Sequence, residues 1–239
     1  MRRILTLTIL GLAGFCLPAQ AANLNIGGLT SQAQFQALSE DLGAALSYKP
    51  LQPAEPLGVF GFDIGIAATD TKLENSADYA GAFTGSAPSS LVVPTVRAYL
   101  GLPLNFDVGV IYGAVPDSNI ELWGGELRYA LIPGGTATPA VALRASFTSL
   151  AGVDTLKLNT TSVDLSISKG FALFTPYAGI GYVWVQSTPQ GVPSLTADDF
   201  TMSKYFVGLN MNFVFMNIAL EADKTGGTPS YGIKLGFRF

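Results

Sequence analysis

The side chains that could carry out chemistry are few in this chain of 239 residues. It contains no histidine, and its single cysteine, Cys16, lies in an apolar stretch near the N-terminus. Proton transfer and nucleophilic attack near neutral pH usually depend on His, or on a Cys or Ser activated by a neighbouring base. Ser203 and Lys204 could form a Ser–Lys pair, but adjacent residues of a strand point to opposite faces. We therefore predict no enzymatic activity, no cofactor and no metal site.

A second group consists of charged residues at similar heights on the strands predicted below. Each lies roughly four to six residues from the same end of the barrel, on the face away from the apolar side chains. These eight residues, named here the charge belt, are Asp63, Arg97, Glu126, Arg128, Arg144, Asp164, Glu221 and Lys234. Chain order makes Arg144 a neighbour of Asp164. It also makes Asp63 a neighbour of Arg97 and of Lys234, where the sheet closes.

The charge belt has two interpretations. In the first, it is a network of salt bridges that fills the lumen of a narrow β-barrel, since buried charges need partners. In the second, it is a constriction that selects solutes. We favour the network, because about ten strands enclose a bore only slightly wider than the eight-stranded barrel that side chains can fill.

Strand-like alternation organises the chain from residue 57 onward, most clearly at its end. The odd positions there are apolar or aromatic: Tyr231, Ile233, Leu235, Phe237 and Phe239. The even positions are small or charged, and they include Lys234 and Arg238. Because side chains alternate faces along a strand, one face is apolar and the other carries two cations.

This last stretch resembles the closing strand of Gram-negative outer-membrane β-barrels, which usually ends in Phe and is recognised by the machinery that inserts such barrels. The resemblance implies a location in the outer membrane, contact with its lipid and lipopolysaccharide, and an encounter with the insertion machinery. Aromatic residues also fall near both ends of the predicted strands, as is typical where headgroups meet hydrocarbon.

We predict an all-β fold: an antiparallel up-and-down transmembrane barrel over residues 57–239, with ten strands, or with eight as the alternative. Strands of about 9 to 11 residues suffice to cross a bilayer when tilted. Connections after even-numbered strands are short and the longest follow odd-numbered strands, which is typical of periplasmic turns and outer loops, respectively. This arrangement predicts that both ends of the mature chain are periplasmic. We expect a monomer.

The N-terminus predicts a cleaved secretory signal over residues 1–21. Two arginines precede a mostly apolar run at residues 4–17, and Ala19-Gln20-Ala21 has the A-x-A form of a cleavage site. The mature chain then has no cysteine and no disulfide. It keeps 11 basic residues against 17 acidic ones, and this excess of negative charge disfavours a nucleic-acid partner.

Residues 22–56 differ from the rest of the chain. Thr30 or Ser31 can cap a helix that runs to about Leu46. Its apolar stripe comprises Phe35, Leu38, Leu42 and Ala45, and its polar side comprises Gln32, Gln36, Glu40 and Asp41. Prolines then stiffen a connector into the first strand.

Two positions remain open for this helix. It could plug the mouth of the barrel, or it could lie against the periplasmic rim. We favour the plug, because the stripe could pack on inward apolar residues of the strands: Val93, Tyr99, Ile111, Val183, Val185 and Phe206.

Three functions follow from this architecture. The first is a narrow or closed structural or surface barrel with a charge-paired lumen, which we favour. The second is a porin-like passage for small solutes or for amphipathic or hydrophobic molecules, gated by the helix. The third is an adhesin or receptor that acts through the long loops at residues 73–90 and 187–200.

Overall fold

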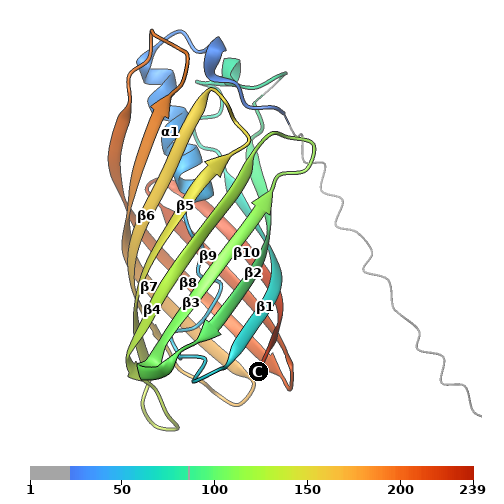
Figure 1. Ribbon diagram of the computed structural model, residues 1–239, viewed down its shortest axis with the longest axis vertical. Helices are drawn as coiled ribbons and strands as arrows, with labels where there is room; N and C mark the ends of the chain where they lie inside the picture. The colour runs from blue at the N-terminus through green and yellow to red at the C-terminus, as the bar shows by residue number, and fades with distance from the viewer. Residues whose placement is uncertain (1–21, 86) are drawn as a thin grey trace, which may run out of the picture.

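The computed structural model describes residues 22–85 and 87–239 and shows a closed β-barrel with a helix inside it (Figure 1). The predicted signal at residues 1–21 lies outside the described residues. The helices are η1 (Ile26–Gly28), α1 (Gln32–Leu46), η2 (Ala80–Ala82) and η3 (Pro103–Asn105). The strands are β1 (Phe62–Lys72), β2 (Ser90–Gly101), β3 (Phe106–Ala114), β4 (Glu121–Pro133), β5 (Ala140–Ala151), β6 (Leu156–Ser168), β7 (Phe174–Pro189), β8 (Asp198–Phe213), β9 (Met216–Thr225) and β10 (Thr228–Arg238).

Each strand pairs antiparallel with its neighbours in sequence, and β1 pairs with β10 to close the barrel. Asp63 lies opposite Arg238 at this seam, and Phe62 and Phe239 exchange backbone hydrogen bonds of 2.8 and 2.9 Å. The prediction of a ten-strand up-and-down barrel is therefore confirmed, and the eight-strand alternative is wrong.

The two faces of the barrel wall have the chemistry that the alternation predicts. Outward side chains are apolar and exposed; Ile66, Val110 and Val207, for example, are 56%, 59% and 59% exposed. Inward charged residues such as Arg97 and Arg144 are fully buried. An apolar outer face that surrounds buried inward charges is the arrangement of a barrel that faces lipid. At the turn end, Phe239 stacks on Phe62 and Phe215 with ring centroids 5.0 Å apart in each pair.

Pro94 lies within β2, where the sequence predicts a bulge or the upper end of a strand. Its pairing with Ala68 of β1 is in register, and the ladder from β2 to β3 begins one residue later, at Thr95. The proline thus sits where the ladder to β3 ends, and its missing N–H removes no hydrogen bond there. The register shift of the sheet occurs instead in β4, between Ala130 and Ile132.

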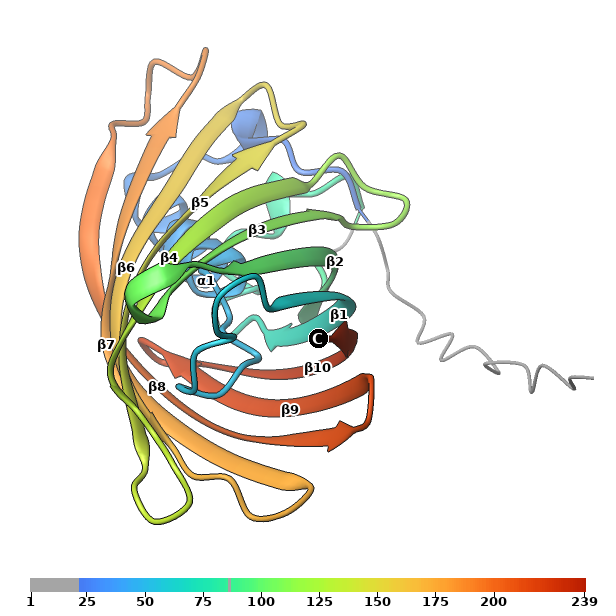
Figure 2. The ribbon, with the colours of Figure 1, turned by 60° about the horizontal axis from the view of Figure 1, so that its bottom comes forward.

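The chain enters the barrel from the end opposite the C-terminus. Residues 22–31 lie among the outer loops, α1 descends inside the wall, and residues 47–61, named here the connector, run through the lumen to β1 (Figures 1 and 2). The first described residues and Phe239 therefore lie at opposite ends of the barrel, so the prediction that both ends of the mature chain lie at one and the same end, the periplasmic one, is wrong. The end with residues 22–31 is named here the outer end, and the end with Phe239 the inner end. The connections after β2, β4, β6 and β8 lie at the same end as Phe239, whereas the two longest connections, after β1 and β7, and the two-residue turn after β9 lie at the other end.

Candidate functional site: the filled lumen

The connector occupies the inner half of the lumen, and the inward side chains hold it by its backbone. Lys204 Nζ donates to the carbonyl of Tyr48 at 2.6 Å, and Arg97 Nη1 donates to that of Lys49 at 2.6 Å. Arg128 Nη1 donates to the carbonyl of Pro53, also at 2.6 Å. A proline-rich segment cannot form a regular ladder of its own, so its buried carbonyls need such donors.

Carboxylates and a serine bind the N–H groups of the same segment. The amide of Leu51 donates to Glu221 Oε2 at 2.8 Å, and that of Leu57 donates to Asp107 Oδ1 at 3.0 Å. The amide of Ala54 donates to Ser168 Oγ at 3.0 Å. Charge-assisted hydrogen bonds of this kind are among the stronger ones in proteins. Side chains of the lumen therefore bind the backbone of the connector at several points between Tyr48 and Leu57.

Ion pairs across the strands complete the network. Asp63 contacts Lys234 Nζ at 2.7 Å and Arg238 Nη2 at 2.8 Å, and it also accepts from Asn217 at 3.0 Å. The predicted neighbourhood of Asp63 and Lys234 holds. Arg97, the other predicted neighbour of Asp63, instead donates to the connector, and its guanidinium lies 5.8 Å from the ring centroid of Tyr48.

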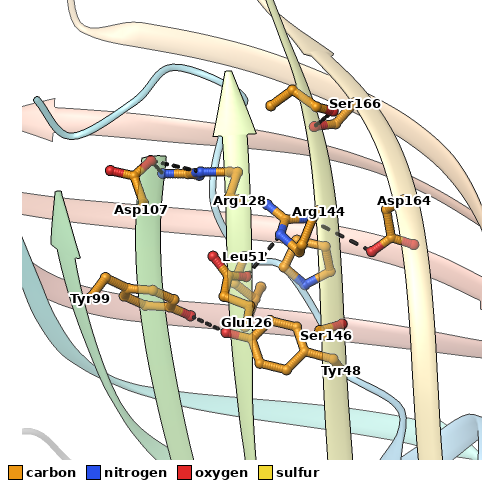
Figure 3. Close-up of polar contacts among 12 residues, drawn as sticks. Tyr48, Leu51, Tyr99, Asp107, Glu126, Arg128, Arg144, Ser146, Asp164 and Ser166 are labelled. Atoms are coloured by element: carbon orange, nitrogen blue, oxygen red, sulfur yellow. Dashed lines mark hydrogen bonds and ion pairs between the residues drawn. The ribbon is translucent and has the colours of Figure 1, made fainter. Parts of the chain in front are cut away.

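Arg144 lies between two carboxylates (Figure 3). Its Nε is 2.8 Å from Glu126 Oε2, an ion pair without hydrogen-bond alignment, and its Nη1 is 3.9 Å from Asp164 Oδ2. Asp164 is also 3.2 Å from Lys204 Nζ. Four of the inward charges of this region thus form one connected cluster around the connector.

Several charged residues that make ion pairs in the lumen lie outside the predicted charge belt. Asp107 binds both Nε and Nη2 of Arg128, at 3.1 and 2.9 Å, and Lys49 of the connector pairs with Asp223. The alternation along the strands places Asp107, Lys204 and Asp223 on the inward face, so their inward position could be predicted from the sequence. Their partners could not, because strand tilt and shear bring together residues that lie at different distances from the strand ends.

Two tyrosines join the connector to the wall. The hydroxyl of Tyr48 donates to that of Tyr99 on β2 at 3.2 Å, and both rings are buried (Figure 3). Tyr99 also accepts from Arg97 Nη1 at 3.3 Å. Tyr177 of β7 donates to Glu221 Oε2 at 3.0 Å, so this oxygen accepts hydrogen bonds from both Tyr177 and the amide of Leu51. Together these bonds leave the inner lumen occupied by protein side chains and backbone.

The outer half of the lumen is apolar and holds α1. Ser31 caps the helix by accepting from the amide of Gln34, as the sequence predicts for this residue or Thr30. Phe35, Leu38 and Leu42 are fully buried in one cluster with inward residues of the strands, among them Val93, Ile111, Leu122, Leu158, Val183 and Val185. All four residues of the predicted apolar stripe, Ala45 included, belong to this cluster, as do five of the six predicted wall residues. Phe206 is the exception: it is buried but lies outside the cluster, beside Tyr177.

Asp41 is an exception to the predicted polar side of the helix. Its side chain is fully buried and accepts from the amide of Asn75 at 2.8 Å and from the hydroxyl of Tyr79 at 2.7 Å. Thr228 of β10 lies 3.4 Å from it. Burial, together with the hydrogen bond to Asp41, raises the pKa of Tyr79, so the phenol remains a donor at neutral pH. Asp41 therefore fastens α1 to the outer loop between β1 and β2.

Residues 22–32, which include the first residue of α1, bond to four loops at the outer end of the barrel. Leu24 exchanges hydrogen bonds of 2.8 and 2.9 Å with the side chain of Asn119, and the amide of Ile26 donates to Thr155 Oγ1 at 3.2 Å. The amide of Asn25 donates to the carbonyl of Ala82 at 2.8 Å. The side chain of Gln32, at the start of α1, makes two bonds to the backbone of Thr196, of 3.1 and 3.0 Å. This segment is named here the outer strap.

The remaining predicted sites lie as follows. Tyr231, Ile233, Leu235, Phe237 and Phe239 belong to β10 or its end, and their outward side chains lie on the apolar face. Lys204 points inward, whereas Ser203 lies on the opposite side of β8, so the two do not form a catalytic pair. Within residues 22–85 and 87–239 there is no group of three or more acidic, Cys or His side chains placed to hold a metal ion, and no helix long and apolar enough to span a membrane.

Comparisons with known proteins find outer-membrane β-barrels among the solved structures. No protein-family model matches the chain, and no curated protein matches it. Among solved structures, the N-terminal β-barrel domain of Pseudomonas aeruginosa OprF is 18% identical, with 76% of this chain and 99% of that chain covered and a TM-score of 0.40. Ail of Yersinia pestis is 11% identical over 75% and 97% of the chains, with a TM-score of 0.31. Neisserial surface protein A is 10% identical over 75% and 95%, with a TM-score of 0.32.

Proposed function

We propose that this chain is an integral outer-membrane β-barrel whose lumen is closed by its own N-terminal segment. The outward apolar wall supports a lipid-facing location. The observation that supports closure most strongly is that lumen side chains bind both the carbonyls and the amides of the connector, from Tyr48 to Leu57. On this proposal the protein is a closed structural or surface barrel, without catalytic residues.

The outer face is the part of such a barrel that meets the surroundings. The outer strap bonds to the loops after β1, β3, β5 and β7, so it joins them into one surface. A closed lumen leaves this surface, together with the lipid-facing wall, as the place where the protein acts.

Single-channel recording in planar bilayers tests the closure. The full chain should not conduct, whereas a variant without residues 22–57 should conduct small ions, because the deletion removes the chain from the lumen. The strand signal in circular dichroism verifies that the variant is folded. A full chain that conducts as well as the deletion variant would contradict the proposal and favour a helix-gated passage.

A further inference from the structure

The outer wall of the barrel carries an apolar groove of about 870 Å³ that spans β5 to β10. Its floor lies along one row of paired outward residues: Ile167, Ala178, Val207, Ala222 and Tyr231. The small Ala178 and Ala222 alternate with larger neighbours in this row, and this leaves the hollow. Its volume lies in the range of roughly 300 to 1,000 Å³ that is common for ligand sites.

A cation stands at the outer edge of the groove. Lys224 is exposed, one residue before the end of β9, and it pairs with Tyr205 of β8 and Pro229 of β10. Lys224 makes no salt bridge with any residue that the structure describes. Lys72, the outward lysine at the end of the neighbouring strand β1, pairs with Glu74. A lysine on a lipid-facing wall extends toward the headgroup region and is stabilised there by an anion.

We propose that this groove binds an acylated lipid with a phosphate headgroup, which places its chains along the apolar floor and its phosphate on Lys224. The inference rests on the proposed function, because it needs the apolar wall to face lipid and the end that carries Lys224 to face outward. Two features favour this occupant: the floor row of Ile167, Ala178, Val207 and Ala222 suits acyl chains, and the cation at the outer rim is complementary to a phosphate. Tyr205 and Tyr231 flank the same rim, and tyrosine is frequent at headgroup level.

Native mass spectrometry of the full-length protein in detergent tests the site with two probes of equal acyl chains: phosphatidic acid, whose headgroup is an anionic phosphate monoester, and phosphatidylcholine, whose phosphate is balanced by its own choline cation. The wild-type protein should retain phosphatidic acid preferentially. Lys224→Gln should reduce that preference by about tenfold, the effect of losing one charge-assisted hydrogen bond. Ala222→Leu should reduce the retention of both lipids, because its side chain fills the floor.

Lys157→Gln is the matched control, since Lys157 is an exposed lysine at the outer end of β6 that does not line the groove. It should leave the preference unchanged. The proposal is overturned if Lys224→Gln behaves like the wild-type protein, or if Lys157→Gln lowers the preference equally and so reveals a general effect of surface charge. Failure of the lumen closure would appear separately, as conductance through the full chain.

Discussion

Arg144 is the residue whose removal should damage the lumen most. It is buried between Glu126 and Asp164, at 2.8 and 3.9 Å. Arg144→Met keeps most of the volume but leaves Glu126 without a cation, and breaking a buried ion pair in this way costs about 3 to 5 kcal/mol. We expect the Tm in detergent to fall by roughly 6 to 12 °C even at the lower cost.

Lys72→Met is the control for this change, because the pair of Lys72 and Glu74 is exposed. Exposed pairs contribute up to about 1 kcal/mol, so the Tm should shift by less than about 4 °C. An Arg144→Met variant with an unchanged Tm and raised conductance in bilayers would contradict the network and favour a constriction that selects solutes.

At the scale of single residues, parity along each strand could be predicted from the sequence, but partners could not. Inward placement of Asp63, Arg97 and Arg144 follows from local alternation alone. Which atoms these residues contact depends on the shear of the barrel and on the connector. The sequence offers no local signal that Arg97 of β2 will bind the carbonyl of Lys49 at 2.6 Å, because the connector has no periodic pattern.

Among the elements, α1 and the loop after β1 depend on each other through Asp41. Asp41→Asn keeps the size of the side chain but replaces one acceptor oxygen with a donor, which then faces the N–H and O–H donors of Asn75 and Tyr79. Hydrogen bonds to a charged group contribute about 1.5 to 3 kcal/mol. We therefore expect chymotrypsin to cleave the loop at Tyr79 or Phe83 at least about tenfold faster.

The control is Asp199→Asn, which changes an exposed acid of β8. Its cleavage rate should equal that of the wild-type protein. Equal rates for Asp41→Asn and the wild-type protein would show that the loop is held by contacts other than Asp41.

The elements themselves were predictable to different degrees. The helix bounds follow from the Ser31 cap and the stripe of Phe35, Leu38 and Leu42, and the strands follow from alternation. The path of residues 47–61 does not, because their partners lie as far away as Glu221 and Asp223. The path of the connector also explains why the N-terminal end was placed wrongly. An even number of strands puts the start of β1 at the same end of the barrel as the end of β10, but it does not define the route by which the chain reaches β1.

For the whole molecule, the structure shows that the chain passes through its own lumen, and the orientation we propose makes this passage run from the outside inward. An epitope tag inserted between Ala22 and Asn23 should bind antibody on intact cells. A tag inserted between Gly135 and Thr136, in the turn between β4 and β5, should bind only after the outer membrane is permeabilised. The reverse labelling would mean that the barrel has the opposite orientation.

The central claim, that α1 lies inside the barrel, is tested most directly by a disulfide. A Cβ atom placed at Gly43 would lie 2.9 Å from Cγ2 and 3.1 Å from Cγ1 of Val185, whose γ position a cysteine sulfur would take. Disulfides need Cβ atoms about 3.5 to 4.5 Å apart, which this contact allows. The described residues contain no cysteine that could compete.

The measurement is the extent of cross-linking in the membrane-embedded protein after mild oxidation, read from the mass of a fragment pair after proteolysis. We expect nearly complete cross-linking for Gly43→Cys with Val185→Cys, and none for Gly43→Cys with Val207→Cys, since Val207 lies on the outer face of β8. A Gly43→Cys, Val185→Cys protein that stays reduced, with its helix thiol open to a membrane-impermeant maleimide, would contradict the claim that α1 lies inside the barrel.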